Sequence, residues 1–128
     1  MFLSALLREP DEAWSLVNAD TGALLATHVR AAVDSASRRR GLLGRTDLED
    51  EALIIAPCTA VHTCFMRFSI DVIVTDRRGV VRRGVPGVRP WRITGALRGF
   101  ATIELPAGSL SRTGTRRGQR LELRRRSP

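Results

Sequence analysis

The sequence predicts a mainly β fold: a small antiparallel β-sandwich or barrel of about seven short strands with one short helix. Short apolar or β-branched runs recur along the chain, and Gly, Pro and Asp turn signals separate them. Only residues 33–43 have the composition and end signals of a helix. The chain has 128 residues, 43% of them hydrophobic, which suits a single core. We therefore expect one domain over residues 14–123.

The N-terminal third is expected to hold a hairpin and the helix. Residues 1–13 are treated as an N-terminal arm. Residues 14–18 alternate weakly between apolar and polar, Asp20-Thr21-Gly22 is a turn signal, and residues 23–30 are expected to form the returning strand. In the helix predicted at residues 33–43, Asp34 or Ser35 could cap the start and Gly41 or Gly44 the end.

The remaining strands are expected on both sides of a long irregular connection. Glycines and prolines interrupt residues 84–99 throughout, so no strand is expected there. Asp76-Arg77-Arg78-Gly79 has the composition of a hairpin turn. The Arg-rich residues 124–128 are expected to be a disordered tail. Strands are predicted at residues 52–56, 70–75, 80–83, 100–105 and 119–124.

The charge of the chain is strongly asymmetric. All 21 basic residues are Arg, and the formal net charge is +8. Residues 1–65 carry six Arg against nine acidic residues, whereas residues 66–128 carry fifteen Arg against four. Such asymmetry can mark a surface for nucleic acid or an acidic partner. We favour a solvated basic face, because four Phe, two Trp and no Tyr leave little for base stacking.

The composition also indicates where in the cell the protein is expected. No run approaches the roughly 18 apolar residues that a membrane span needs. The apolar N-terminal residues lack a preceding basic region, so no signal peptide is expected. Two cysteines do not make a disulfide framework. We expect a cytoplasmic protein, a monomer or weak dimer, with two free thiols and no cofactor.

Three ordered blocks carry a resemblance to a known family. Residues 57–71 contain the pattern Pro57-Cys58-x-x-x-His62-Thr63-x-x-Met66-x-x-x-Ile70-Asp71. The other blocks are Arg38-x-Arg40-Gly41-Leu42-Leu43-Gly44-Arg45 and Glu104-Leu105-Pro106-Ala107-Gly108. The chain thereby resembles the family catalogued as domain of unknown function 192, although Ser37, Leu43 and Cys64 depart from its usual residues. The resemblance implies a compact, mainly β single domain and no assigned reaction, substrate or cofactor.

His62, Asp71 and Glu104 are the catalytic candidates within these blocks. A histidine oriented by a carboxylate can act as a general base, and Thr63 or Cys64 could supply a nucleophile. The alternative is structural: these buried polar groups would tie loop to strand by hydrogen bonds. We favour the structural role.

Cys58, His62 and Cys64 are the candidate metal ligands. Thiolate and imidazole suit zinc, but a closed site needs four ligands and the usual paired spacing is absent. His28 or Asp71 would have to complete the set. No metal is therefore expected.

We place a ligand site where the 57–71 loop meets the 104–108 turn. Arg45 and Arg67 are the best anion-binding candidates, since a guanidinium group suits carboxylate or phosphate. The favoured function is a non-catalytic binding module for an unknown small molecule or protein. The alternatives are a hydrolase-like enzyme that uses His62 with Asp71 or Glu104, and an Arg-driven binder of nucleic acid or an acidic partner. The predicted site residues are His62, Thr63, Met66, Asp71, Glu104, Arg45 and Arg67.

Overall fold

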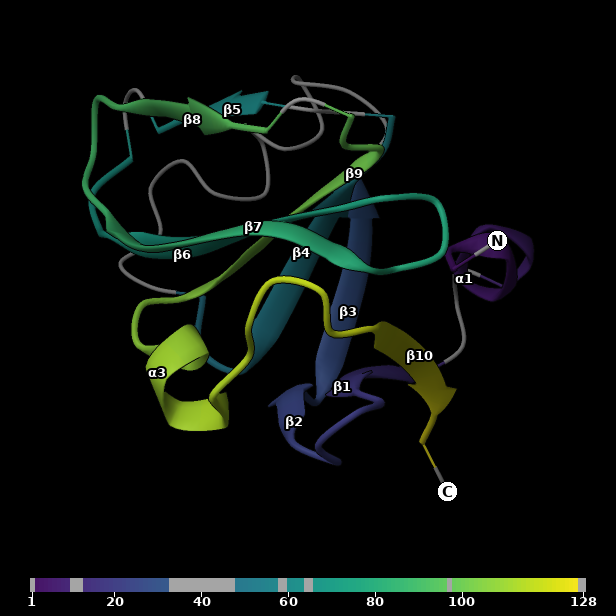
Figure 1. The fold of residues 1–128 in the computed structure, drawn as a ribbon. Coiled ribbons are helices and arrows are strands. Elements are labelled where there is room, and N and C mark those ends of the chain that lie inside the picture. The colour runs from purple at the N-terminus through teal and green to yellow at the C-terminus, as the bar shows by residue number, and fades with distance from the viewer. Residues whose placement is uncertain are drawn as a thin grey trace.

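The strands of the protein, seen in a computed structural model, form three sheets (Figure 1). The structure describes residues 2–9, 13–32, 48–57, 60–63, 66–96 and 98–126. A five-stranded sheet in the order β3-β4-β9-β6-β7 lies between a three-stranded sheet, β10-β1-β2, and a two-stranded ribbon, β5-β8. The strands are β1 Trp14–Asn18, β2 Leu24–Ala26, β3 His28–Ala32, β4 Glu51–Ile55, β5 Ala60–His62, β6 Ile70–Thr75, β7 Val81–Val88, β8 Ile93–Gly95, β9 Ala101–Pro106 and β10 Leu121–Arg125. The predicted mainly β fold is confirmed, and the described residues form ten strands in place of about seven.

The central sheet is buried on both faces, and this produces two cores. Alternate side chains of a strand point to opposite faces. On β4, Ala52 and Ile54 therefore join the core shared with the three-stranded sheet, whereas Leu53 and Ile55 join a second core. Met66 and the half-buried Ala96, which follow β5 and β8 respectively, pack into this second core. The two cores therefore lie on either side of the central sheet.

Residues 84–99 were expected to be irregular, and that expectation is wrong. Strand β7 continues to Val88, and β8 pairs with the distant β5. Strand β7 is the last strand of its sheet, so one of its edges is not paired with another strand of that sheet. Glycine and proline are tolerated at such an edge, which explains why Gly84, Pro86 and Gly87 do not end the strand.

The expected strand 23–30 is divided between two sheets. It breaks at Thr27, so that β2 pairs with β1 while β3 pairs with β4. The β3–β4 pair is parallel, which departs from the antiparallel pattern of the other strand pairs in the described residues. The helix expected at residues 33–43 lies outside the described part of the chain.

The N-terminal residues belong to the core and do not form an arm. Helix α1, Ser4–Arg8, carries Leu6 into the first core, and Leu3 is buried beside it. The backbone N–H of Phe2 donates to the carbonyl of Arg77, 2.9 Å away, in the turn after β6. Gly79, in the same turn, has a φ of 86°, and a Cβ there would lie 2.6 Å from the Leu121 carbonyl. The turn thus needs glycine.

The C-terminal residues are also more ordered than expected. Arg124 and Arg125 lie in β10, opposite Ser15 and Trp14, and the N–H of Arg126 donates to the Ala13 carbonyl. Pairing with β1 replaces the expected disordered tail at least to Arg126. A short helix, α3, Ser109–Thr113, occupies the expected turn after β9.

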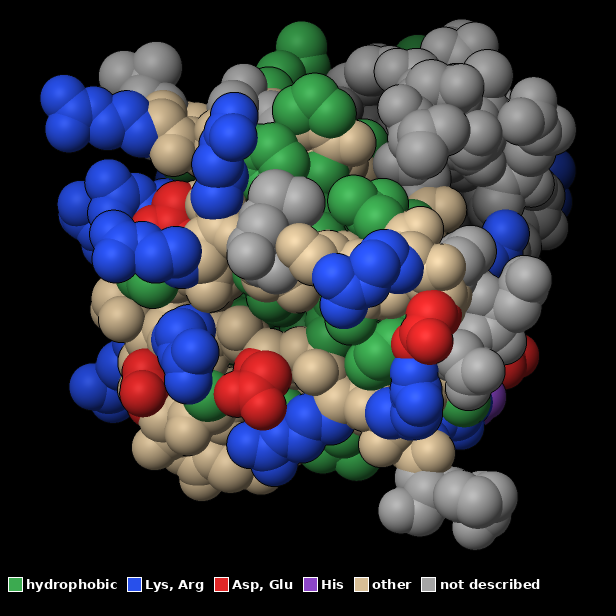
Figure 2. All heavy atoms as spheres, turned by 90° about the vertical axis from the view of Figure 1, so that its right-hand side faces the viewer, with side chains coloured by type: hydrophobic (Ala, Val, Ile, Leu, Met, Phe, Trp, Pro, Cys, Tyr) green, Lys and Arg blue, Asp and Glu red, His purple; other side chains and the backbone are tan. Residues whose placement is uncertain are grey.

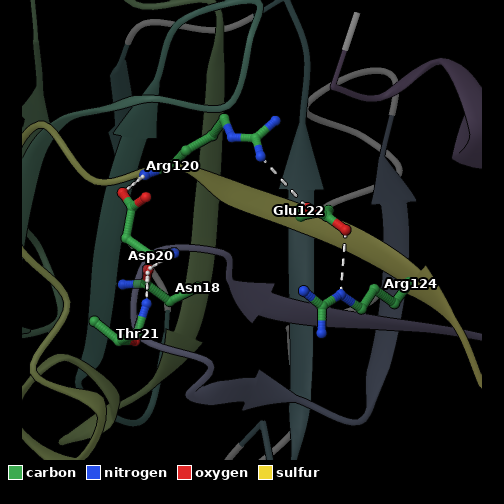
Figure 3. Close-up of polar contacts among 6 residues, drawn as sticks. All are labelled: Asn18, Asp20, Thr21, Arg120, Glu122 and Arg124. Atoms are coloured by element: carbon green, nitrogen blue, oxygen red, sulfur yellow. Dashed lines mark hydrogen bonds and ion pairs between the residues drawn. The ribbon is translucent and has the colours of Figure 1, made fainter.

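Polar contacts close the β1–β2 hairpin and join it to β10 (Figure 3). The buried Asn18 side chain accepts hydrogen bonds through Oδ1 from the N–H groups of Asp20 and Thr21, at 3.0 and 3.2 Å. The Asp20 carboxylate accepts one from the Arg120 N–H at 2.9 Å. The predicted turn at residues 20–22 is therefore held by an Asx-type arrangement. None of the helices in the described residues is long and apolar enough to cross a membrane.

Candidate functional site

The two carboxylates predicted to share a site lie on opposite faces of the central sheet. Asp71 of β6 is opposite Leu105 of β9, which belongs to the first core. Glu104 is opposite Val72, which belongs to the second core. Directly opposed residues share a face, so the sheet separates the Asp71 and Glu104 side chains. They do not form a carboxylate pair.

Asp71 is a buried acceptor of backbone hydrogen bonds. Its Oδ1 accepts from the Gly87 N–H at 2.9 Å, and its Oδ2 accepts from the Leu110 N–H at 2.8 Å. The side chain is fully buried. One carboxylate thereby fixes β7 and the start of α3 to β6, which matches the structural alternative for this residue.

Thr63 also ties distant segments together. Its Oγ1 donates to the Arg89 carbonyl at 2.6 Å and accepts from the Arg92 N–H at 2.9 Å. Its carbonyl accepts from the N–H groups of Trp91 and Met66. The buried threonine therefore holds the turn between β7 and β8, and its hydroxyl is engaged in that role.

Of the other predicted site residues, Met66 and Arg67 follow Thr63 in the chain, and the Met66 N–H donates to the Thr63 carbonyl. Met66 is buried in the second core and Arg67 is exposed. The backbone of His62 pairs with Ile93 in the β5–β8 ribbon. Arg45, Cys58 and Cys64 lie outside the described residues. Over the part of the chain that the structure describes, no three His, Cys, Asp or Glu side chains are grouped to hold a metal.

An open groove between β7 and α3 is lined by four arginines. It has a volume of about 890 Å³. Arg82 and Arg83 line it from β7, and Arg116 and Arg117 line it from the segment after α3. Its remaining walls are apolar or small: Gly84, Pro86, Ala96, Leu110, Ser111, Gly114 and Thr115. Among the described residues that line this β7–α3 groove, none is acidic.

Asp71 joins the two elements between which the groove lies. Its carboxylate accepts hydrogen bonds from Gly87 in β7 and from Leu110 in α3. Gly84 lets Leu110 approach the strand, because a Cβ at position 84 would lie only 3.3 Å from both Leu110 methyl groups. Asp71 therefore supports the groove from behind, and none of the predicted site residues that the structure describes is among the residues that line it.

Sequence reasoning missed the groove because its arginines are far apart in the chain. The only signal was the pair of Arg-Arg doublets at residues 82–83 and 116–117. The returning β9 and helix α3 bring the doublets to one groove. Basic charge is not confined to it: on the face that carries α1 and β10, arginines are interspersed with a few acidic side chains (Figure 2).

Comparison with known proteins gives a family and a fold. A crystal structure from Sinorhizobium meliloti 1021, of a protein described as a candidate transcription regulator, is similar with a TM-score of 0.70 and 24% identity over 87% of this chain and 92% of that one. A protein of unknown function from Novosphingobium aromaticivorans DSM 12444 is similar with a TM-score of 0.70 and 20% identity over 86% and 83%. At this identity the likeness shows the fold alone.

The sequence itself matches no curated protein. It does match the family model of domain of unknown function 192, described as "Uncharacterized ACR", over residues 16–123. This match covers most of the chain and all three ordered blocks of the predicted resemblance. The protein is therefore a member of the family of domain of unknown function 192, whose function is unknown.

Proposed function

We propose that the protein is a non-catalytic binding module whose β7–α3 groove binds a small organic anion. The observation that carries this proposal is the convergence of Arg82, Arg83, Arg116 and Arg117 on one groove, with no acidic residue among the described residues that line it. Like charges gathered from two elements repel one another, and a bound anion would relieve that repulsion. We further propose that the protein works in the cytoplasm as a monomer or weak dimer.

The chemistry of the lining defines the ligand class. A guanidinium group presents a planar fork of donors that matches phosphate or carboxylate. Arg83 uses one nitrogen to bind the Gly95 carbonyl at 2.7 Å, which orients the group and leaves its other donors for a ligand. The apolar part of the lining consists of Leu110, Pro86 and Ala96. The ligand class is therefore an apolar body that carries a phosphate or carboxylate.

Binding is supported over hydrolysis by the state of the predicted catalytic groups. Both oxygens of Asp71 accept backbone hydrogen bonds, and the central sheet separates this residue from Glu104. A general base must reach the proton that it removes. Asp71 in this arrangement is better suited to hold the groove than to activate a nucleophile.

The test is calorimetric titration with three probes: phenyl phosphate, inorganic phosphate, which lacks the ring, and benzyl alcohol, which lacks the phosphate. We expect phenyl phosphate to bind most tightly, phosphate more weakly, and benzyl alcohol not at all. In the R82Q/R116Q double variant, affinity for phenyl phosphate should fall by at least tenfold per arginine, because hydrogen bonds to charged groups contribute about 1.5–3 kcal/mol each.

The matched control is the R120Q/R124Q double variant, which removes the same charge away from the groove, at the residue before β10 and within β10. It should bind phenyl phosphate nearly as the native protein does. Equal losses in both double variants would mean that net charge, and not the groove, attracts the anion. Equal binding of benzyl alcohol, or no binding of phenyl phosphate, would also overturn the proposal.

A further inference from the structure

Two large apolar side chains stand out on the turn and ribbon that follow β7. Trp91 is 57% exposed and Ile93 is 80% exposed, the highest fractions among the exposed large hydrophobic residues of the described chain. Arg89 and Arg92, both exposed, lie in the same turn. We call these four residues the Trp91 surface. It lies on the opposite side of the central sheet from the three-stranded sheet (Figure 1).

The backbone of Trp91 is held in an unfavourable conformation. Its φ is 65°, in the left-handed region that a bulky side chain rarely adopts, at a cost of about 1–3 kcal/mol. The Trp91 N–H donates to the Thr63 carbonyl at 3.0 Å, and the next N–H, of Arg92, donates to the Thr63 hydroxyl. A buried residue of the family block thus maintains a strained turn. The strain does not bury the tryptophan, which remains exposed.

The segment of the chain that carries this surface bears charge of a single sign. Residues 77–103 contain seven Arg and no Asp or Glu. Arg83, from the neighbouring strand, reaches the ribbon through its bond to the Gly95 carbonyl. A partner that covers Trp91 and Ile93 must therefore accept several guanidinium groups and offer an apolar medium.

We infer that the Trp91 surface docks onto an anionic lipid bilayer. Tryptophan favours the boundary between headgroups and acyl chains, an aliphatic side chain gains by entering the acyl region, and arginines bind anionic headgroups. Single-stranded nucleic acid fits less well, because Ile93 has no ring on which a base could stack. A stable protein interface buries about 800 Å² on each partner, which is far more than two side chains provide.

This docking is weak and reversible, since it uses two apolar side chains and no spanning segment. Each arginine near an anionic membrane contributes about fivefold in affinity. Burying the Ile93 side chain in the bilayer raises the affinity by about tenfold or more. Membrane binding should therefore require both the apolar side chains and the arginines, and its affinity should fall as the salt concentration is raised.

The experiment is co-sedimentation with vesicles of phosphatidylcholine alone or of phosphatidylcholine and phosphatidylserine in equal parts. We expect binding to the mixed vesicles only, with a blue shift in tryptophan emission that the W91F variant lacks. The other tryptophan, Trp14, is buried and should not respond. The I93S variant should lose about tenfold in affinity, while the matched L24S variant, which alters an exposed leucine on β2, should lose nothing.

The arginines are tested in the same assay. The R89Q/R92Q double variant should lose about twenty-fivefold in affinity, from two contributions of about fivefold each. The R120Q/R124Q double variant removes the same charge at the start of β10 and within it, and should lose much less. The inference is overturned by equal binding to both kinds of vesicle, by vesicle binding that I93S leaves intact, by absence of vesicle binding, or by a tryptophan response to single-stranded oligonucleotide without one to vesicles.

Discussion

Replacing Asp71 by Asn tests whether this carboxylate holds the β7–α3 region together. In the native protein each oxygen accepts one backbone hydrogen bond, from Gly87 at 2.9 Å and from Leu110 at 2.8 Å, in a fully buried position. The amide of Asn can accept from one of these groups but directs a donor at the other. One charge-assisted bond, about 1.5–3 kcal/mol, is lost, and the other becomes a neutral bond worth about 1 kcal/mol.

We therefore expect the D71N variant to lose about 3 kcal/mol in the free energy of unfolding, measured by urea denaturation. Domains of this size are stable by about 5–15 kcal/mol, so the variant should remain folded. The slope of the unfolding transition should not change, because the surface exposed on unfolding is the same.

Asp76 supplies a matched control. Its Oδ1 alone accepts from two backbone N–H groups, of Arg78 at 2.8 Å and Val80 at 3.0 Å, in an accessible turn. An Asn oxygen can accept both bonds, so the D76N variant should lose less than about 1 kcal/mol. A D71N loss as small as that of D76N would refute the buried arrangement described for Asp71.

Two further predictions concern stability. The T63V variant removes a hydroxyl that forms hydrogen bonds with the backbone of Arg89 and Arg92. The free energy of unfolding, measured by urea denaturation, should therefore fall by about 2 kcal/mol. An unchanged midpoint would contradict the described turn. The L3A variant should lose about 2–5 kcal/mol, because Leu3 is 1% exposed in the first core, whereas L7A, at a side chain 52% exposed, should change the midpoint little. Equal small effects of L3A and L7A would mean that the N-terminal residues are an arm after all.

The strands of the central sheet were predictable because burial on both faces leaves continuous apolar runs. Residues 52–56, 70–75 and 100–105 were placed within one residue at each end of β4, β6 and β9. The edge strand β7 was not predicted beyond residue 83, because glycine and proline normally indicate the end of a strand. They are tolerated at the edge of a sheet, but the sequence alone does not show that β7 lies at an edge. The β5–β8 pairing joins segments about thirty residues apart, and no local pattern reports it.

One feature of the predicted site depends on a register that the sequence cannot resolve. Whether Asp71 and Glu104 share a face depends on the register of β6 against β9, and a shift by one residue would reverse it. The structural alternative for Asp71 was open from the sequence, and its backbone hydrogen bonds support it. The only sign of the groove arginines in the sequence was their high number. Because arginine is frequent throughout the chain, that number did not single them out.

The most direct test of the binding proposal is a crystal structure of the native protein grown with phenyl phosphate. The account predicts the phosphate group in the β7–α3 groove, within hydrogen-bonding distance of the guanidinium groups of Arg82 and Arg116, with the ring against Leu110. Phenyl phosphate bound elsewhere on the surface, with the groove arginines turned to solvent, would contradict it.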